Sequence, residues 1–231
     1  MIYLYYAIGI IAILLILLFS SRSRIKSKYT KYLKIPNQAG LTGEQVANII
    51  MNKKSLDIEL GQNEEDLCDA YYPNKKLLLM SSKVCNTPSI ASVAIVCHEL
   101  GHATQHKEKT LLYCANMFLS KLTRFTNHLI IPLFIFGLFA FALRWPTEDI
   151  GIYMCMTSII LFLLHAVVKI IIIPLEFDAS KRAIKMIQKY GLLTKKELQK
   201  SRSLLNTAGQ TYIVALFDDF NNTIKKIFKK R

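Results

Sequence analysis

Three long stretches of this 231-residue chain contain no charged residue. They run from Ile2 to Phe19, from Phe125 to Leu143 and from Ile150 to Val168. Because a helix rises about 1.5 Å per residue, roughly 20 apolar residues cross a bilayer core. The pattern therefore predicts three transmembrane helices, at 1–20, 127–144 and 150–173. The alternative for each stretch is a buried helix in the core of a soluble protein.

The first stretch has a second alternative, a cleaved signal peptide. No Lys or Arg precedes it, and Ser20-Ser21-Arg22 and further basic residues follow where a small-residue cleavage site would be expected. An uncleaved membrane anchor is therefore the better interpretation. The second stretch differs in being interrupted by Pro132.

The positive charge is unevenly distributed between these stretches. The chain has 30 Lys and Arg against 16 Asp and Glu, a net charge of +14. Residues 21–126 carry 15 basic and 9 acidic side chains, residues 174–231 carry 13 and 5, and the short loop 145–149 is acidic. Because basic loops stay in the cytoplasm, we expect a multi-pass cell-membrane protein with an external N-terminus, an external loop and two cytoplasmic segments.

The overall composition changes how this charge is interpreted. Hydrophobic residues make up 52% of the chain, which excludes a disordered protein and is unusual for a soluble nucleic-acid-binding domain. The basic charge therefore predicts attraction to membrane lipid and not to nucleic acid. Five cysteines without a C-x-x-C motif indicate reduced thiols and not a disulfide framework.

The first basic segment contains the signals of a small mixed α and β part. Thr42 predicts the capped start of a short helix, and Leu56 to Gly61 and Lys76 to Ser82 are strand candidates. A turn at 72–74 lies between the two strands, so we expect a small hairpin or sheet edge. Pro88 is expected in the first turn of the helix that follows.

That helix carries the sequence His98-Glu99-Leu100-Gly101-His102, an H-E-x-x-H motif. Two histidines four residues apart lie on one helical face and can both bind one zinc ion. The glutamate beside the first histidine is then placed to take a proton from a water molecule. The alternative is that His98 and His102 only pack on an amphipathic helix.

A catalytic zinc site needs a third protein ligand. His106 continues the stripe of histidines, but it lies one further turn along the helix and cannot easily reach the same ion. Glu176, just after the third apolar stretch, is the best candidate, and Asp178 is the second. The alternative is that Glu176 is an interfacial carboxylate that pairs with Lys169 or Arg182.

The position of Glu176 requires a break in the chain after the motif. One straight helix from His102 to Phe125 would carry the metal about 35 Å from the membrane, far from Glu176. We expect the break at the charged residues 107–110. Residues 111–124 then form an amphipathic stretch that could lie along the membrane surface, with the active site close to the bilayer.

Five runs of sequence are recognisable together: Asp69-Ala70-Tyr71-Tyr72-Pro73, Leu77-Leu78-Leu79-Met80-Ser81, Thr87-Pro88-Ser89-Ile90, His98 to His106, and Glu176-Phe177-Asp178-Ala179-Ser180-Lys181-Arg182-Ala183. Almost end to end, the chain resembles the YugP-like neutral zinc metallopeptidases of bacterial membranes. That family is similar to the HtpX-type and prenyl-protein endopeptidases, whose zinc is held by H-E-x-x-H and a glutamate on a later helix.

The resemblance implies a role for each motif residue. It implies that His98, His102 and Glu176 hold zinc and that Glu99 is the general base. The chain departs from the HtpX pattern four residues after the ligand glutamate, where those relatives carry an aspartate and this chain has a serine. Asp178 or the serine itself would then take over the aspartate's role.

The sequence thus predicts a mainly α membrane protein with a zincin-like α+β cytoplasmic part at 21–126, three transmembrane helices, and a helical cytoplasmic part at 174–231. We expect an integral membrane zinc metalloendopeptidase that cleaves a peptide or membrane protein. The substrate would pair with an edge strand around Leu77 to Ser81. Tyr212 and Arg182 are candidate donors to the developing oxyanion. The alternative function is a catalytically inactive, zinc-stabilised membrane scaffold.

Overall fold

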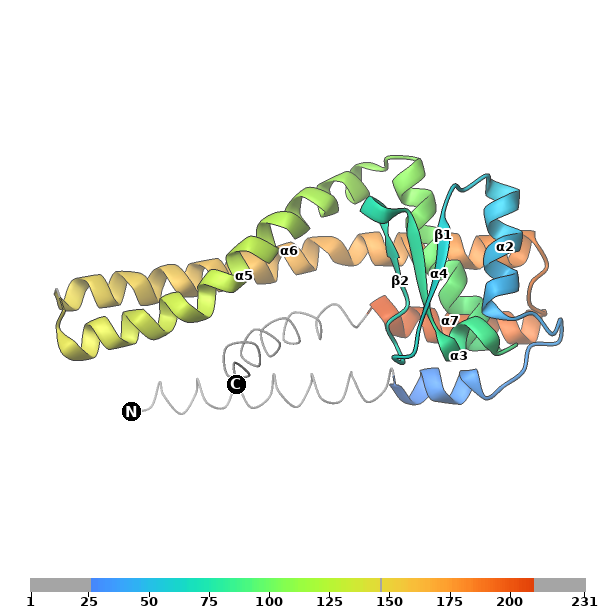
Figure 1. The fold of residues 1–231 in the computed structure, drawn as a ribbon, viewed down its shortest axis with the longest axis horizontal. Coiled ribbons are helices and arrows are strands. Elements are labelled where there is room, and N and C mark those ends of the chain that lie inside the picture. Colours follow the sequence, from blue (N-terminus) through green and yellow to red (C-terminus); the bar gives the residue numbers. More distant parts are fainter. Residues whose placement is uncertain (1–25, 146, 210–231) are drawn as a thin grey trace. The chain divides into compact units, whose positions relative to one another are not determined.

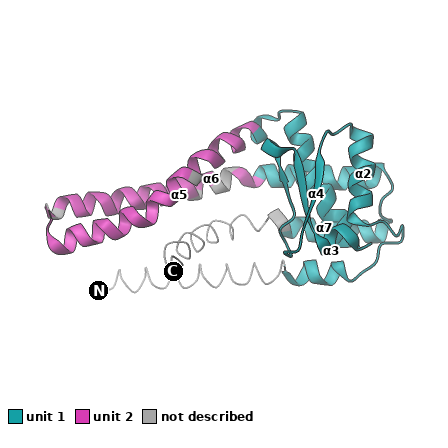
Figure 2. Ribbon diagram, viewed as in Figure 1, with its two compact units in different colours: residues 1–113, 174–211 teal, residues 114–173, 212–231 magenta. Residues whose placement is uncertain are grey.

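The computed structural model describes residues 26–145 and 147–209, and these form two compact units (Figures 1 and 2). Unit 1 contains residues 26–113 and 174–209, and unit 2 contains residues 114–173. The elements in chain order are α2 (Gly43–Lys54), β1 (Glu59–Asn63), β2 (Ala70–Tyr72), the 3-10 helix η1 (Pro73–Lys75), β3 (Leu77–Ser81), α3 (Ser82–Asn86), α4 (Ile90–Lys107), α5 (Leu111–Leu143), α6 (Glu148–Lys189) and α7 (Lys195–Gly209). The predicted helix at 1–20 and Tyr212 lie outside the described residues.

A small sheet in unit 1 has the strand order β1-β3-β2. The two predicted strands are present, but β1 and β3 pair in parallel, with Glu59 opposite Leu77. The hairpin forms instead between β2 and β3, which are antiparallel and joined by η1 and a left-handed Lys76 at φ 47°. The expectation that Leu77 to Ser81 forms an edge strand was therefore wrong. β3 is the central strand, with β1 on one side and β2 on the other. The sequence did not reveal β2, because it is only three residues long and shows no alternation.

Helix α4 runs through the middle of unit 1. Its side chains are buried on most sides, and it contacts α2, α3, α7 and the sheet. The helix is capped by the Ser89 side chain, which accepts a hydrogen bond from the Ser92 N–H, so Pro88 lies just before the helix and not in its first turn. The predicted cap of α2 is confirmed, with reciprocal hydrogen bonds between Thr42 and Gln45.

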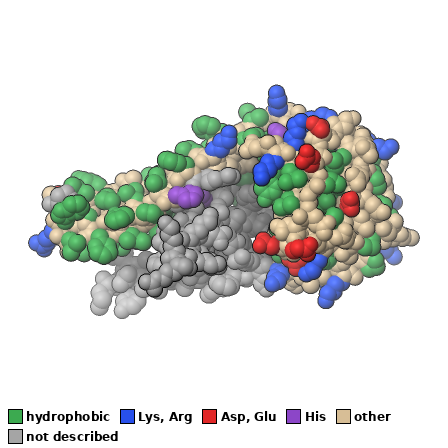
Figure 3. Space-filling view, viewed as in Figure 1, with side chains coloured by type: hydrophobic (Ala, Val, Ile, Leu, Met, Phe, Trp, Pro, Cys, Tyr) green, Lys and Arg blue, Asp and Glu red, His purple; other side chains and the backbone are tan. Residues whose placement is uncertain are grey.

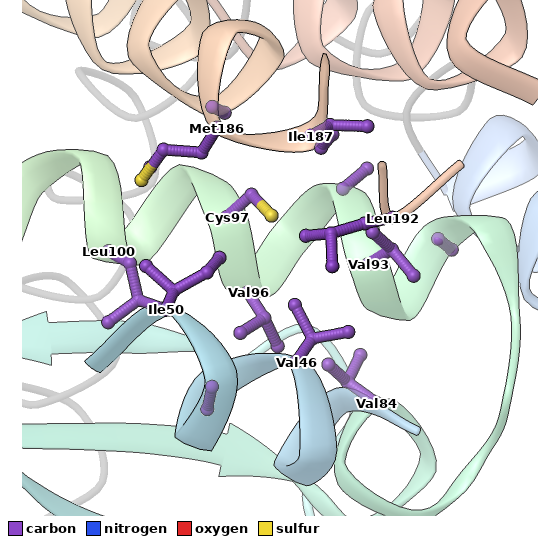
Figure 4. Packing of buried hydrophobic residues seen from close by; sticks show 14 of the residues in the cluster. Val46, Ile50, Val84, Val93, Val96, Cys97, Leu100, Met186, Ile187 and Leu192 are labelled. Carbon is purple, nitrogen blue, oxygen red and sulfur yellow. The ribbon is translucent and has the colours of Figure 1, made fainter. Parts of the chain in front are cut away.

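The core of unit 1 forms where other helices pack against α4 (Figure 4). Apolar side chains from α2, α4 and the C-terminal part of α6 meet there, and β3 adds Leu78 and Met80. The labelled members of this cluster are Val46, Ile50, Val84, Val93, Val96, Cys97, Leu100, Met186, Ile187 and Leu192. The core therefore fixes the helix that carries the H-E-x-x-H motif on several sides.

The predicted break after the motif is confirmed. Helix α4 ends at Lys107, and Lys109 adopts a left-handed conformation with φ 50° before α5 begins at Leu111. The expected separate stretch at 111–124 was wrong, because α5 continues without interruption to Leu143 and includes Pro132 within the helix. No glycine or proline occurs between Leu111 and Ile131 to end the helix.

Unit 2 is a hairpin of α5 and the first part of α6. The two helices approach closely at small residues: a Cβ atom on Gly151 would lie 2.7 Å from the Cα of Phe141. Buried Ser158 donates a hydrogen bond of 2.7 Å to the Ile130 carbonyl across the pair. Many large apolar side chains of the hairpin are exposed, as its visible face shows (Figure 3). Within the described residues, α5 alone is long and apolar enough to count as a candidate membrane span, so the three predicted spans are not shown.

Candidate metal centre

Two helices of unit 1 bring three potential metal ligands together. His98 and His102 lie one turn apart on α4, with their ring centroids 4.8 Å apart and the rings edge to face. Glu176 on α6 faces both rings: its Oε2 is 3.3 Å from His98 Nε2, and its Oε1 is 3.2 Å from His102 Nε2. The three ligand atoms lie within 4.8 Å of one another. The structure therefore assembles the predicted triad from segments 78 residues apart.

The approach of the two helices depends on Gly101, which lies between Glu99 and His102 on α4. A Cβ atom at this position would lie 2.7 Å from the carbonyl oxygen of Ala179 on α6. The contact involves backbone and not a flexible side chain, so it could not be relieved by a rotamer change. A glycine at position 101 therefore allows α6 to come close enough for Glu176 to face the histidines.

The electrostatics of the triad follow from its burial and its pairing. Burial acts to raise the pKa of Glu176, but hydrogen bonds from His102 and His98 outweigh it and hold the pKa far below its usual range. Burial acts to lower the pKa of His102, but the hydrogen bond and charge of Glu176 raise it to about 9. Glu176 is thus a carboxylate that attracts positive charge to the site.

The donor set fits zinc. Two imidazole nitrogens and one carboxylate oxygen are the protein ligands of one common class of catalytic zinc site, in which a fourth position stays open for water or substrate. His98 and Glu176 are almost fully buried, at 7% and 4% exposure. The Glu176 carboxylate and the His98 ring therefore interact with each other and not with solvent. Softer metals that prefer thiolates are disfavoured, because no cysteine belongs to the group.

Glu99 lies beside the triad but is not part of it. Its Oε2 accepts a hydrogen bond of 3.0 Å from the backbone N–H of Tyr71 in β2. Burial raises the pKa of Glu99 above its usual value, although the nearby histidines oppose the rise. The sheet therefore holds this carboxylate in place in an environment that favours uptake of a proton.

The Nδ1 atoms of the two histidines have different hydrogen-bond partners. His98 Nδ1 is 3.2 Å from the hydroxyl of Ser180, and His102 Nδ1 is 3.0 Å from Oε1 of Gln105. Ser180 thus occupies the position where the HtpX pattern has an aspartate, and it contacts a ligand directly. Asp178 reaches the site only through Gln105, whose Nε2 donates to Asp178 Oδ2 at 2.8 Å.

Three other candidate residues lie near the site or outside the described chain. His106 is not among the clustered ligands, as expected; its Nδ1 is 2.8 Å from the Tyr71 hydroxyl, and its ring packs against Tyr113. Arg182 donates from Nε to Asp178 and from Nη1 to Glu108, both at 2.6 Å, so Glu176 does not pair with it. The proposed contacts of Arg182 and Tyr212 with substrate stay predictions.

Sequence reasoning missed two residues that shape the site. The run from His98 to His106 contains Gln105 but its pattern gives this residue no role, although it lies three residues after His102 and therefore on the same helical face. Tyr71 contributes through its backbone N–H, which no side-chain pattern reveals. A search for polar side chains three or four residues from each histidine would have found Gln105.

Comparisons with known proteins agree with this donor set. The model of the family described as "Putative neutral zinc metallopeptidase" matches residues 5–229. The protein named "Putative membrane protease YugP" from Bacillus subtilis (strain 168) is 28% identical over 198 residues, which cover 85% of this chain and 84% of that protein. No solved structure matches the chain. Because the family model spans nearly the whole sequence, the chain belongs to this family of neutral zinc metallopeptidases.

Proposed function

We propose that this protein is an integral membrane zinc metalloendopeptidase whose active site faces the cytoplasm near the bilayer. The observation that carries the proposal is the convergence of His98, His102 and Glu176 with Glu99 beside them. Family membership supports both the metal and the reaction class. Hydrolysis of a peptide bond requires a metal site with an open position and a proton acceptor next to it, and this arrangement offers both.

Each residue of the site has a distinct role in the proposed reaction. His98, His102 and Glu176 hold the zinc ion, which when bound supplies a Lewis acid that makes water more acidic and polarises a carbonyl. Glu99 takes a proton from the attacking water and later delivers it to the leaving amine nitrogen. The Tyr71 N–H donates to Oε2 of Glu99 and so holds this carboxylate in position.

The substrate pairs with β2 in this proposal, and not with β3 as the sequence suggested. β3 has a strand on each side, so among the described residues the free edges of the sheet belong to β1 and β2. Of these, β2 contacts α4, and its Tyr71 donates to Glu99. An extended peptide added to the open edge of β2 would therefore lie beside the general base, in the manner of strand addition to a sheet edge.

The membrane placement rests on the hairpin of unit 2 and on charge. Helix α5 has the length and apolar character of a span, and the relative from Bacillus subtilis carries the name of a membrane protease. The basic segments on both sides of the hairpin favour the cytoplasm. A peptide or membrane-protein substrate would then be cleaved on the cytoplasmic side, and anionic lipid, not nucleic acid, is the partner of the basic surface.

The test compares Glu99→Gln with wild type in lipid nanodiscs. The variant should keep its zinc, because Glu99 is not a ligand, and should lose cleavage of an unstructured peptide library by about 100- to 10,000-fold, the usual contribution of a general base. Glu44→Gln, the same chemical change on α2, is the matched control and should cleave like wild type. Undiminished cleavage by Glu99→Gln would overturn the mechanism. Zinc retention without cleavage by wild type would favour the inactive scaffold.

A further inference from the structure

The side-chain amide of Gln105 can point only one way. Its Nε2 lies 3.1 Å from the carbonyl oxygen of Leu175 and 2.8 Å from the Asp178 carboxylate. Both groups accept hydrogen bonds and cannot donate them, so the amide nitrogen and not the oxygen must face them. Gln105 is fully buried, and solvent therefore offers no alternative partner. The amide oxygen is left facing His102.

This orientation determines which nitrogen of His102 carries the hydrogen. Gln105 Oε1 can only accept, and it is 3.0 Å from His102 Nδ1, so Nδ1 must donate. Nε2 faces Glu176, so it is the nitrogen that must give up its hydrogen for the ring to bind a metal. Metal-binding histidines usually have this arrangement, in which the ring nitrogen away from the metal donates to a fixed acceptor.

The Asp178 oxygen that accepts from Gln105 also accepts a hydrogen bond from Arg182. This oxygen, Oδ2, accepts the Nε–H of Arg182 at 2.6 Å, one turn further along α6. The Nη1 of Arg182 donates to Glu108 at the C-terminal cap of α4. A hydrogen-bonded path therefore runs from His102 through Gln105 and Asp178 to Arg182, and it ties α4 to α6 outside the ligand triad.

His98 does not have a comparable partner. Its Nδ1 faces the hydroxyl of Ser180 at 3.2 Å, and a hydroxyl can either donate or accept. The serine therefore permits both tautomers of His98, whereas Gln105 permits only one for His102. In this chain the restriction therefore falls on the second histidine of the motif.

We infer that Gln105, oriented by Asp178 and Arg182, is a positioning residue that fixes the tautomer and ring orientation of His102 for metal binding. The inference rests on the proposed zinc site and adds the group that prepares one of its ligands. Partners of this kind usually change metal affinity by about 10- to 100-fold when they are removed. The same range is expected here for the loss of the Gln105 amide.

The primary test is the zinc dissociation constant, measured by competition with a chelating dye in detergent. Gln105→Met keeps the length of the side chain but removes the acceptor, and we expect zinc affinity to fall about 10- to 100-fold. Thr104→Val is the matched control: Thr104 is the neighbouring buried residue, and its hydroxyl donates only to the Leu100 carbonyl. Zinc affinity of Gln105→Met equal to that of Thr104→Val would overturn the inference.

A second variant covers the case in which Gln105→Met does not fold. Asp178→Asn changes a partly exposed side chain and removes the charged one of the two acceptors that orient the Gln105 amide, so zinc affinity should fall several-fold. Asp57→Asn makes the same chemical change at an exposed carboxylate that pairs with Lys76 and takes no part in this path, so it should bind zinc like wild type. Equal affinities for Asp178→Asn and Asp57→Asn would also overturn the inference. If wild type itself bound no zinc, the proposed function would fail instead.

The absorption spectrum of the cobalt-substituted protein separates a change in ligand geometry from a general loss of stability. Because cobalt d–d bands report ligand geometry, Gln105→Met should change their positions, whereas Thr104→Val should not. Thermal unfolding of the metal-free forms identifies any variant that is simply destabilised. Unchanged cobalt bands in Gln105→Met would contradict a role in orienting His102.

Discussion

In unit 1 the large apolar side chains are buried, whereas in unit 2 many of them face outward. Ile50 and Leu100 of unit 1 have no exposed surface, but Phe118 and Phe136 of the hairpin are 71% and 65% exposed. Burying such a side chain is worth about 1.5 to 3 kcal/mol. Unit 1 therefore obtains its stability within itself, and the hairpin leaves apolar surface that lipid would cover in the proposed placement.

Helix α6 belongs to both regions, and its pattern of burial changes between them. Its first part, to residue 173, belongs to the hairpin, and the part from Pro174 onward packs in unit 1. In the second part, Leu175, Ala179 and Ala183 are buried at helical spacing, and Glu176 lies on the same side. One helix can therefore supply an apolar surface in one unit and a metal ligand in the other.

The largest expected difference between the units comes from truncating one side chain in each. Ile50→Ala leaves a cavity in the core of unit 1 and should destabilise that unit by about 2 to 5 kcal/mol. Phe136→Ala removes an exposed side chain and should change stability by less than about 0.5 kcal/mol. Native-state hydrogen exchange in detergent measures both, through the α4 amides for Ile50→Ala and the α5 amides for Phe136→Ala. Equal loss of protection in the two variants would break the comparison.

A smaller effect is expected from a single added methyl group at a close helix contact. Gly101→Ala places a Cβ against the Ala179 carbonyl and should cost about 1 to 3 kcal/mol while moving Glu176 away from the histidines. Zinc affinity should fall with it. Gly137→Ala makes a comparable close contact within the hairpin, against Cys155, and should leave zinc affinity unchanged. A loss of zinc binding in Gly137→Ala alone would contradict the assignment of the site to unit 1.

The smallest predicted effect is a pH dependence at the surface of unit 1. Burial acts to raise the pKa of Glu197, but hydrogen bonds from Thr194 and the Gln38 N–H outweigh it and lower the pKa. Because the folded pKa lies below the unfolded one, the stabilisation is complete above about pH 4.3 and disappears as the pH falls through the folded value.

Glu197 is partly exposed, so its contribution should stay below about 1 kcal/mol. Glu197→Gln should be less stable than wild type at pH 7 and equal to it at low pH. Urea unfolding of both proteins at several pH values, monitored by hydrogen exchange of the α7 amides, measures this difference in stability. A gap that persists unchanged at acidic pH would contradict the role given to the carboxylate.

The sequence predicted the parts of the site that depend on local spacing. His98, Glu99 and His102 share one helix, so the 3.6-residue period places them together without knowledge of the fold. The break at 107–110 followed from a distance argument and is present in the structure. Glu176 was predicted from its position after an apolar stretch, and the structure brings it to the histidines.

The sequence did not predict features that depend on contacts between distant segments. The parallel pairing of β1 with β3 and the short β2 are set by which strands meet and not by alternation within each strand. The continuity of α5 was also missed, because an amphipathic stretch and a span look different in sequence yet can form one helix. Gln105 is important through its partners on α6, which only the fold brings near.

The most direct test of the metal centre is the zinc content of purified protein, measured by elemental analysis for wild type, Glu176→Ala and Glu99→Gln. Wild type and Glu99→Gln should each carry about one zinc ion per chain, and Glu176→Ala should carry much less, because one of three protein ligands is removed. Full zinc content in Glu176→Ala, or none in wild type, would contradict the account.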